Sequence, residues 1–251
     1  MPADNNWDTV KLPMPGPDPK KKEPAAKPAA QPAKPAATAA AKPAAPAKSA
    51  ASVPKLLDMA GMSATDGCKR FPPSDEALLL LKDGVLLVPF LNTLAKEKLF
   101  ADAVQLLAHA LPKREAVWWA CRCARSIADT NRGKELFAAL KAAEEWVANP
   151  TEEKRRVCET AAEATQYRSA AGLAALAAFF SGGSLAPTGV AAVEPGPLLT
   201  AKAVANAVQL AALGDPLQTE DRYLRFLSEG VRVVEGVSRW TDSQPAPSAS
   251  R

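Results

Sequence analysis

The sequence predicts an all-α fold: stacked antiparallel helix pairs, about eight or nine helices in all, preceded by a disordered Pro/Ala/Lys-rich arm. Three observations support this prediction. Apolar residues recur at helical spacing from Ser74 onwards. No apolar/polar alternation flanked by turn residues indicates a strand. Residues that begin and end helices, such as Asn149-Pro150 and Gly214, stand between the periodic segments.

The arm is defined by its composition. Residues 1–54 hold 12 of the 23 prolines and repeat Lys-Pro-Ala-Ala without apolar periodicity. Such a segment buries too little apolar surface to fold, so we expect it to be disordered. The predicted organisation is an arm over residues 1–54, a single all-α domain over residues 55–240 and a disordered tail over residues 241–251.

Charge separates the arm from the domain. The arm has eight lysines against four acidic residues, a net charge of +4, and the whole chain is also +4. Residues 55–251 are therefore formally neutral and show no charge excess typical of nucleic-acid binding. The seven lysines between Lys20 and Lys48 leave open a weak, salt-sensitive interaction of the arm with nucleic acid or another anionic surface.

The compartment predicted from the sequence is the cytoplasm. The first residues do not form a basic segment followed by an apolar one, as a secretory signal does. The longest apolar run, residues 170–180, is shorter than the roughly 20 residues of a bilayer span. The four cysteines (Cys68, Cys121, Cys123 and Cys158) are expected to be reduced thiols inside the domain.

The expected helices follow from periodicity and from residues that favour helix ends. Ser74 is a good N-cap, Pro89 and Pro112 are expected in first turns, and Asn149 is expected to cap a helix that Pro150 opens. Thr200 is expected to cap a later helix. The predicted helices cover residues 74–82, 89–99, 101–111, 112–129, 134–148, 149–165, 169–180, 200–213 and 219–240.

Two of these helices are expected to bury large apolar side chains. In the helix over residues 134–148, Phe137 is expected to point inward together with Leu136 and Leu140. The segment from Ser169 to Phe180 is almost wholly apolar and is expected to be buried.

The helix over residues 112–129 is predicted to be central. One face is apolar, whereas Trp118 lies on the opposite face with Arg114, Arg122 and Arg125. One interpretation is a tryptophan packed between arginine side chains. The other is a binding hot spot, because tryptophan and arginine are enriched in such sites.

A short amphipathic patch lies at the start of the arm. Trp7, Val10 and Leu12 are candidate anchors that dock on a partner or on the domain of the chain itself. The arm is also consistent with a plain spacer. Together with the four residues around Trp118, these three form the candidate protein interface.

The residues that usually support catalysis do not form a recognisable set. His109 is expected on the solvent side of its helix beside Asp102 and Gln105, without an orienting partner. Cys121 and Cys123 project about 200° apart on a helix, so they cannot share a metal ion and are expected to be buried small residues. Ser181-Gly182-Gly183-Ser184 follows a helix, whose end repels phosphate, and is expected to act as a glycine C-cap. We predict no catalytic residue, no metal and no cofactor.

Three segments resemble an uncharacterised bacterial family that is associated with gene neighbourhoods of type VI secretion systems. The segments are residues 108–120, 170–187 and 199–204, and the resemblance spans roughly residues 71–236. It implies an accessory role near that apparatus and supplies no catalytic residues. The sequence therefore predicts a non-catalytic helical adaptor that binds other proteins, with anionic-surface binding by the arm as the alternative.

Overall fold

The computed structural model describes residues 61–128, 133–187 and 189–237. These residues belong to one of the two units into which the chain divides, Ala50–Arg251. Within them there is no β-strand, only an isolated bridge between Ser63 and Leu86, so the all-α prediction is confirmed. The described elements are α2 (Ala64–Cys68), α3 (Asp75–Leu80), α4 (Leu87–Lys96), α5 (Phe100–Ala110), α6 (Lys113–Ile127), α7 (Lys134–Ala148), α8 (Glu152–Ala164), α9 (Ala170–Phe179), α10 (Leu199–Leu213), the 3₁₀ turn η1 (Pro216–Gln218) and α11 (Thr219–Val234).

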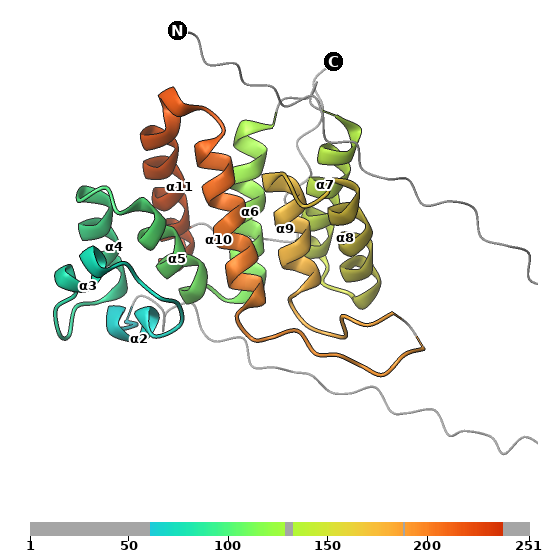
Figure 1. Cartoon of the computed structure of the whole chain (residues 1–251), viewed down its shortest axis with the longest axis horizontal. Coiled ribbons are helices and arrows are strands. Elements are labelled where there is room, and N and C mark those ends of the chain that lie inside the picture. The colour runs from blue at the N-terminus through green and yellow to red at the C-terminus, as the bar shows by residue number, and fades with distance from the viewer. Residues whose placement is uncertain (1–60, 129–132, 188, 238–251) are drawn as a thin grey trace, which may run out of the picture. The chain divides into compact units, whose positions relative to one another are not determined.

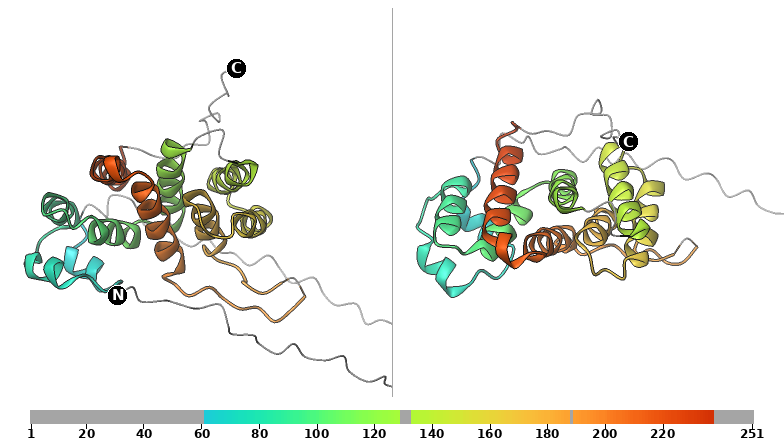
Figure 2. Two further views of the ribbon diagram at one scale, coloured as in Figure 1. Left: turned by 45° about the horizontal axis from the view of Figure 1, so that its top comes forward. Right: turned by 90° about the horizontal axis from the view of Figure 1, so that it is seen from above.

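Helices α6 to α10 run alternately up and down beside one another (Figures 1 and 2). One pocket is lined by the last residues of α6 and α10 and the first residues of α7 and α9. These four helix termini therefore meet at one end of the helices, which we call the pocket end. At the opposite end, the loop of residues 181–198 joins α9 to α10, and we call it the loop end. There Arg114, near the start of α6, donates hydrogen bonds to carbonyls at the end of α7. This alternation agrees with the predicted antiparallel pairs.

Helix α6 packs on α7, α9, α10 and α11, which explains why tryptophan can lie opposite its apolar face. Helix α9 is likewise enclosed by α6, α7, α8 and α10. Its alanines and Phe179 are buried as expected, whereas Leu173, Leu176 and Phe180 are only partly buried. Alanine at these contacts allows close approach of the helix backbones. No described helix is long and apolar enough to cross a bilayer.

Helices α2 to α5 form a smaller group that contacts the others mainly through α5, which packs on α2, α4, α10 and α11 (Figure 1). Helix α2 was not predicted, because five residues are too few to show a helical period. Its N-cap is Ser63, whose side-chain oxygen accepts a hydrogen bond from the amide of Thr65 at 3.2 Å. The predicted Ser74 cap is confirmed, with its oxygen 3.2 Å from the amide nitrogen of Ala77.

Several predicted helix ends were wrong by one to six residues. Thr151, not Asn149, caps α8, because its hydroxyl accepts a hydrogen bond from the amide of Lys154. Asn149 instead ends α7. Thr200 lies inside α10, where its hydroxyl donates to the carbonyl oxygen of Phe180 at 2.9 Å. Helix α11 ends at Val234, because the left-handed conformation of the second residue beyond it, a glycine with φ of +70°, stops the helix.

Candidate functional site

The tryptophan that the sequence placed opposite the apolar face of α6 is buried. The guanidinium of Arg122 lies 5.6 Å from the centre of the Trp118 ring and also pairs with Glu229 of α11 at 2.6 Å. The structure therefore shows the packed arrangement, with the arginine joining the ring to the next helix.

The other two arginines of this predicted group hold α7. Arg114 donates through Nε and Nη2 to the carbonyl oxygens of Val147 and Ala148, at 2.7 and 3.0 Å. These carbonyls lie in the last turn of α7 and lack helical partners. Arg125 makes a two-pronged ion pair with Glu144. The structure thus brings Trp118 and Arg122 together, whereas Arg114 and Arg125 contact α7. The predicted anchors Trp7, Val10 and Leu12 lie outside the described residues.

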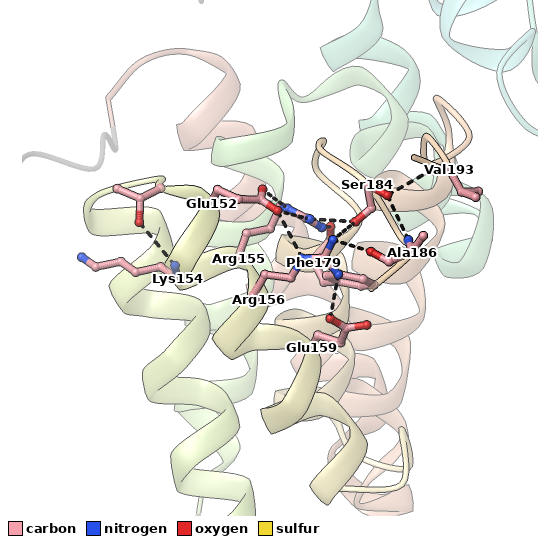
Figure 3. Close-up of polar contacts among 10 residues, drawn as sticks. Glu152, Lys154, Arg155, Arg156, Glu159, Phe179, Ser184, Ala186 and Val193 are labelled. Atoms are coloured by element: carbon pink, nitrogen blue, oxygen red, sulfur yellow. Dashed lines mark hydrogen bonds and ion pairs between the residues drawn. The ribbon is translucent and has the colours of Figure 1, made fainter. Parts of the chain in front are cut away.

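A group of charged residues at the loop end was missed by the sequence reasoning (Figure 3). Arg155 of α8 is only 3% exposed. It pairs with Glu152 and donates to the carbonyl oxygens of Phe179 at 2.6 Å and Ser184 at 2.8 Å. Its guanidinium also stacks 4.7 Å from the centre of the Phe179 ring. We call Glu152, Arg155 and Arg156 the arginine hub.

The arginine hub holds the first part of the loop of residues 181–198. Arg156 donates to the carbonyl oxygens of Ser184 and Ala186, both at 2.7 Å. At Gly183, φ is +64°, and an added Cβ would lie 2.7 Å from Oε2 of Glu152 and 2.9 Å from Nε of Arg155, so a larger residue there would be strained and would displace these side chains. The sequence did contain a signal, because Arg155 falls on the same helical stripe as the buried Cys158 and Ala162.

The pocket end contains a cavity of about 320 Å³ that opens to solvent. Its lining is mainly apolar and includes Leu136, Leu140 and Ile127. Two large apolar side chains at the pocket are well exposed: Phe137 at 54% and Leu210 at 39%. The prediction that Phe137 points inward was therefore wrong; its ring lies under the guanidinium of Arg125, 5.4 Å away.

The charged side chains among the described lining residues are Arg125 and Arg168. Arg125 is neutralised by Glu144, whereas the described residues place no carboxylate against Arg168. Among the described residues, the lining contains no acid, histidine or thiol, and the oxygen of its one hydroxyl, that of Ser169, accepts the capping hydrogen bond from the amide of Gly172. The pocket can bind an apolar group beside an anion.

The four cysteines are free and buried, as predicted. Burial raises the pKa values of the Cys121 and Cys123 thiols well above the usual value of a cysteine. It raises the pKa of the Cys158 thiol to about 12. Thiols of this kind are poor nucleophiles. Within the described residues, no three His, Cys, Asp or Glu side chains are grouped as a metal site requires.

His109 is not on a solvent-facing side, and this prediction was wrong. It is 4% exposed, and its ring stacks on Phe71 at 5.6 Å. The polar side of α5 is covered by residues 70–74, because Asp102 accepts hydrogen bonds from the amide and hydroxyl of Ser74 at 2.8 Å. Neither ring nitrogen of His109 has a hydrogen-bond partner among the described residues.

We expect this histidine to make the fold sensitive to acid. Burial, with positive charge from Lys202 and Arg70 nearby, lowers the pKa of His109 from 6.5 to about 4. As the pH falls, His109 is therefore protonated first in the unfolded chain. The free energy of unfolding is highest above about pH 6.5 and decreases by about 2–3 kcal/mol towards pH 4. Urea unfolding at about pH 7.5 and pH 4.5 measures this decrease. In His109→Leu, the difference in unfolding free energy between the two pH values should be smaller by about 2–3 kcal/mol. An equal pH dependence in both proteins would contradict the assignment.

Comparison with known proteins gives one match. The model of a family of unknown function, DUF6931, matches residues 90–234, from α4 to α11. The chain belongs to this family. The matched region contains all three segments on which the resemblance rests, as well as the pocket lining and the arginine hub. Neither the curated proteins nor the solved structures yielded a match.

Proposed function

We propose that this member of DUF6931 is a non-catalytic helical adaptor that binds other proteins. The observation that carries this proposal is the apolar surface at the pocket end, where the exposed Phe137 and Leu210 flank an open cavity. Leu213, one turn beyond Leu210 on α10, is also exposed. A group of exposed large apolar side chains around a pocket is typical of protein-binding surfaces.

The proposed setting is a bacterial type VI secretion system, in which the protein would be an accessory component. This part of the proposal is supported by the resemblance of residues 108–120, 170–187 and 199–204 to a family associated with such gene neighbourhoods. It predicts that tagged protein from the host cell copurifies with a component of that apparatus.

A second candidate is an interaction of residues 1–54 with nucleic acid or another anionic surface. The supporting observation is that the net charge of +4 of the chain resides in these residues. This interaction would weaken steeply with salt, because it depends on released counterions.

Affinity capture from the host cell distinguishes these functions. We expect the full chain and a variant lacking residues 1–54 to capture the same protein. Phe137→Ser with Leu210→Ser should lose that capture with little change in melting temperature, because both side chains are substantially exposed. Val190→Ser, at a similarly exposed position in the loop of residues 181–198, is the matched control and should retain it. Capture that disappears with residues 1–54, and that high salt abolishes, would favour the second candidate.

A further inference from the structure

The pocket end also indicates what kind of partner it binds. We infer that it receives an amphipathic helical segment of a partner protein that inserts a large apolar side chain into the cavity and places a carboxylate against Arg168. This inference rests on the proposed adaptor function and adds the chemistry of the partner.

The extent of the apolar surface favours a protein segment over a small molecule. The cavity, at about 320 Å³, is near the lower limit of small-molecule sites. A small ligand would fill it and leave Leu213 exposed. Leu213 lies on the same side of α10 as the pocket residue Leu210, because residues three apart are neighbours on a helix. A partner segment with apolar residues on successive turns covers both the pocket and this extension.

The secondary structure of the pocket end favours a helical partner. An extended peptide gains affinity by adding a strand to a sheet edge, and the described residues contain no strand. A helix satisfies its own backbone and docks through side chains at every third or fourth position. The termini of α6, α7, α9 and α10 around the pocket offer side-chain contacts of that kind.

The charge of the lining favours an acidic partner. Of the two arginines that the described residues contribute to the lining, Arg125 is already paired with Glu144. Arg168 is exposed, and the described part of the chain gives it no carboxylate. It immediately precedes the Ser169 N-cap of α9, so the positive end of that helix adds to its charge. A partner carboxylate beside the inserted side chain would complement both the charge of Arg168 and the positive end of α9.

Site-specific photocrosslinking in the host cell tests this inference on the full chain. Benzoylphenylalanine replaces Phe137, which keeps an aromatic ring at the pocket, or Val190, which lies in the loop of residues 181–198. Mass spectrometry then identifies the crosslinked segment. We expect the crosslink from position 137 to fall on a segment with Asp or Glu within one helical turn. Arg168→Glu should lower its yield about tenfold, because like charges then face each other, whereas Arg168→Lys should retain most of it.

The outcomes separate this inference from the proposed function. A protein crosslinked from position 190 and none from position 137 would leave the adaptor function intact and overturn the inference. A crosslink from position 137 that is unchanged in Arg168→Glu, or that falls on a segment without acidic residues or on the chain itself, would also overturn it. No crosslinked protein from either position would contradict both.

Discussion

Replacing Trp119 with alanine lowers the free energy of unfolding by about 3–5 kcal/mol, the range measured for large aromatic truncations in cores. Trp119 has no exposed surface in the described structure, and its indole N–H donates to the carbonyl oxygen of Phe226 on α11 at 2.8 Å. Its loss leaves a cavity where α6 meets α11. Urea unfolding followed by circular dichroism measures the change.

A glycine of α11 provides an internal test of this packing. A Cβ added at Gly230 would lie 2.4 Å from Cδ2 of Leu107 and 2.9 Å from Cε2 of Trp119. Gly230→Ala alone should therefore destabilise the protein by about 1–3 kcal/mol through overpacking. In Trp119→Ala the added methyl group has more room, so the double variant should lose less than the sum of the two single losses. Strict additivity would show that the two residues do not share this contact.

The burial of this part of α6 could be predicted because all the information lies within one helix. A continuous apolar face with tryptophan opposite indicated a helix covered on several sides, and α6 does pack on four others. The buried thiols followed from the same periodicity, since Cys123 falls on the apolar face. The bounds of the helices from α3 onwards were thus largely encoded in their local patterns.

The side chains that were misplaced depend on what covers a face, and periodicity does not carry that information. Asp102 and His109 share a face of α5 that reads as polar, yet residues 70–74 cover it through the bonds between Asp102 and Ser74. The opposite error occurred at Phe137, which the helical spacing placed on the inward face of α7 but which lies exposed at the pocket. In both cases the exposure of the side chain depends on other parts of the chain: on residues at least 28 positions away for Asp102, and on neighbouring helices for Phe137.

The candidate site could not be predicted because it is assembled from four helix ends. Ile127, Phe137, Ala171 and Leu210 come together only when α6, α7, α9 and α10 alternate in direction. The antiparallel arrangement was predicted, but not which termini would meet around an unfilled space. In contrast, an arginine on the buried stripe of α8 was visible in the sequence, and a charged residue at such a position requires a specific set of partners.

Replacing that residue, in Arg155→Ala, is expected to destabilise the protein by about 3–4 kcal/mol, because hydrogen bonds to a charged group contribute about 1.5–3 kcal/mol each. The variant leaves the carbonyl oxygens of Phe179 and Ser184 without this donor and removes the stacking on the Phe179 ring. Glu152 is largely exposed, so its lost ion pair should contribute little.

Two further variants separate the charge of Arg155 from its shape. Lysine keeps the charge but cannot reach Glu152, Phe179 and Ser184 at once, so Arg155→Lys should recover less than half of the loss. Arg156→Lys, on the more exposed neighbour that also bonds the carbonyl of Ser184, is the matched control and should lose about 1 kcal/mol. Hydrogen exchange of the amides of Ala186 and Val193, which donate to the Ser184 hydroxyl, should accelerate in Arg155→Ala before global unfolding. If Arg155→Lys is as stable as the unmodified protein, the fork of hydrogen bonds is not what holds this loop, and the positive charge alone suffices.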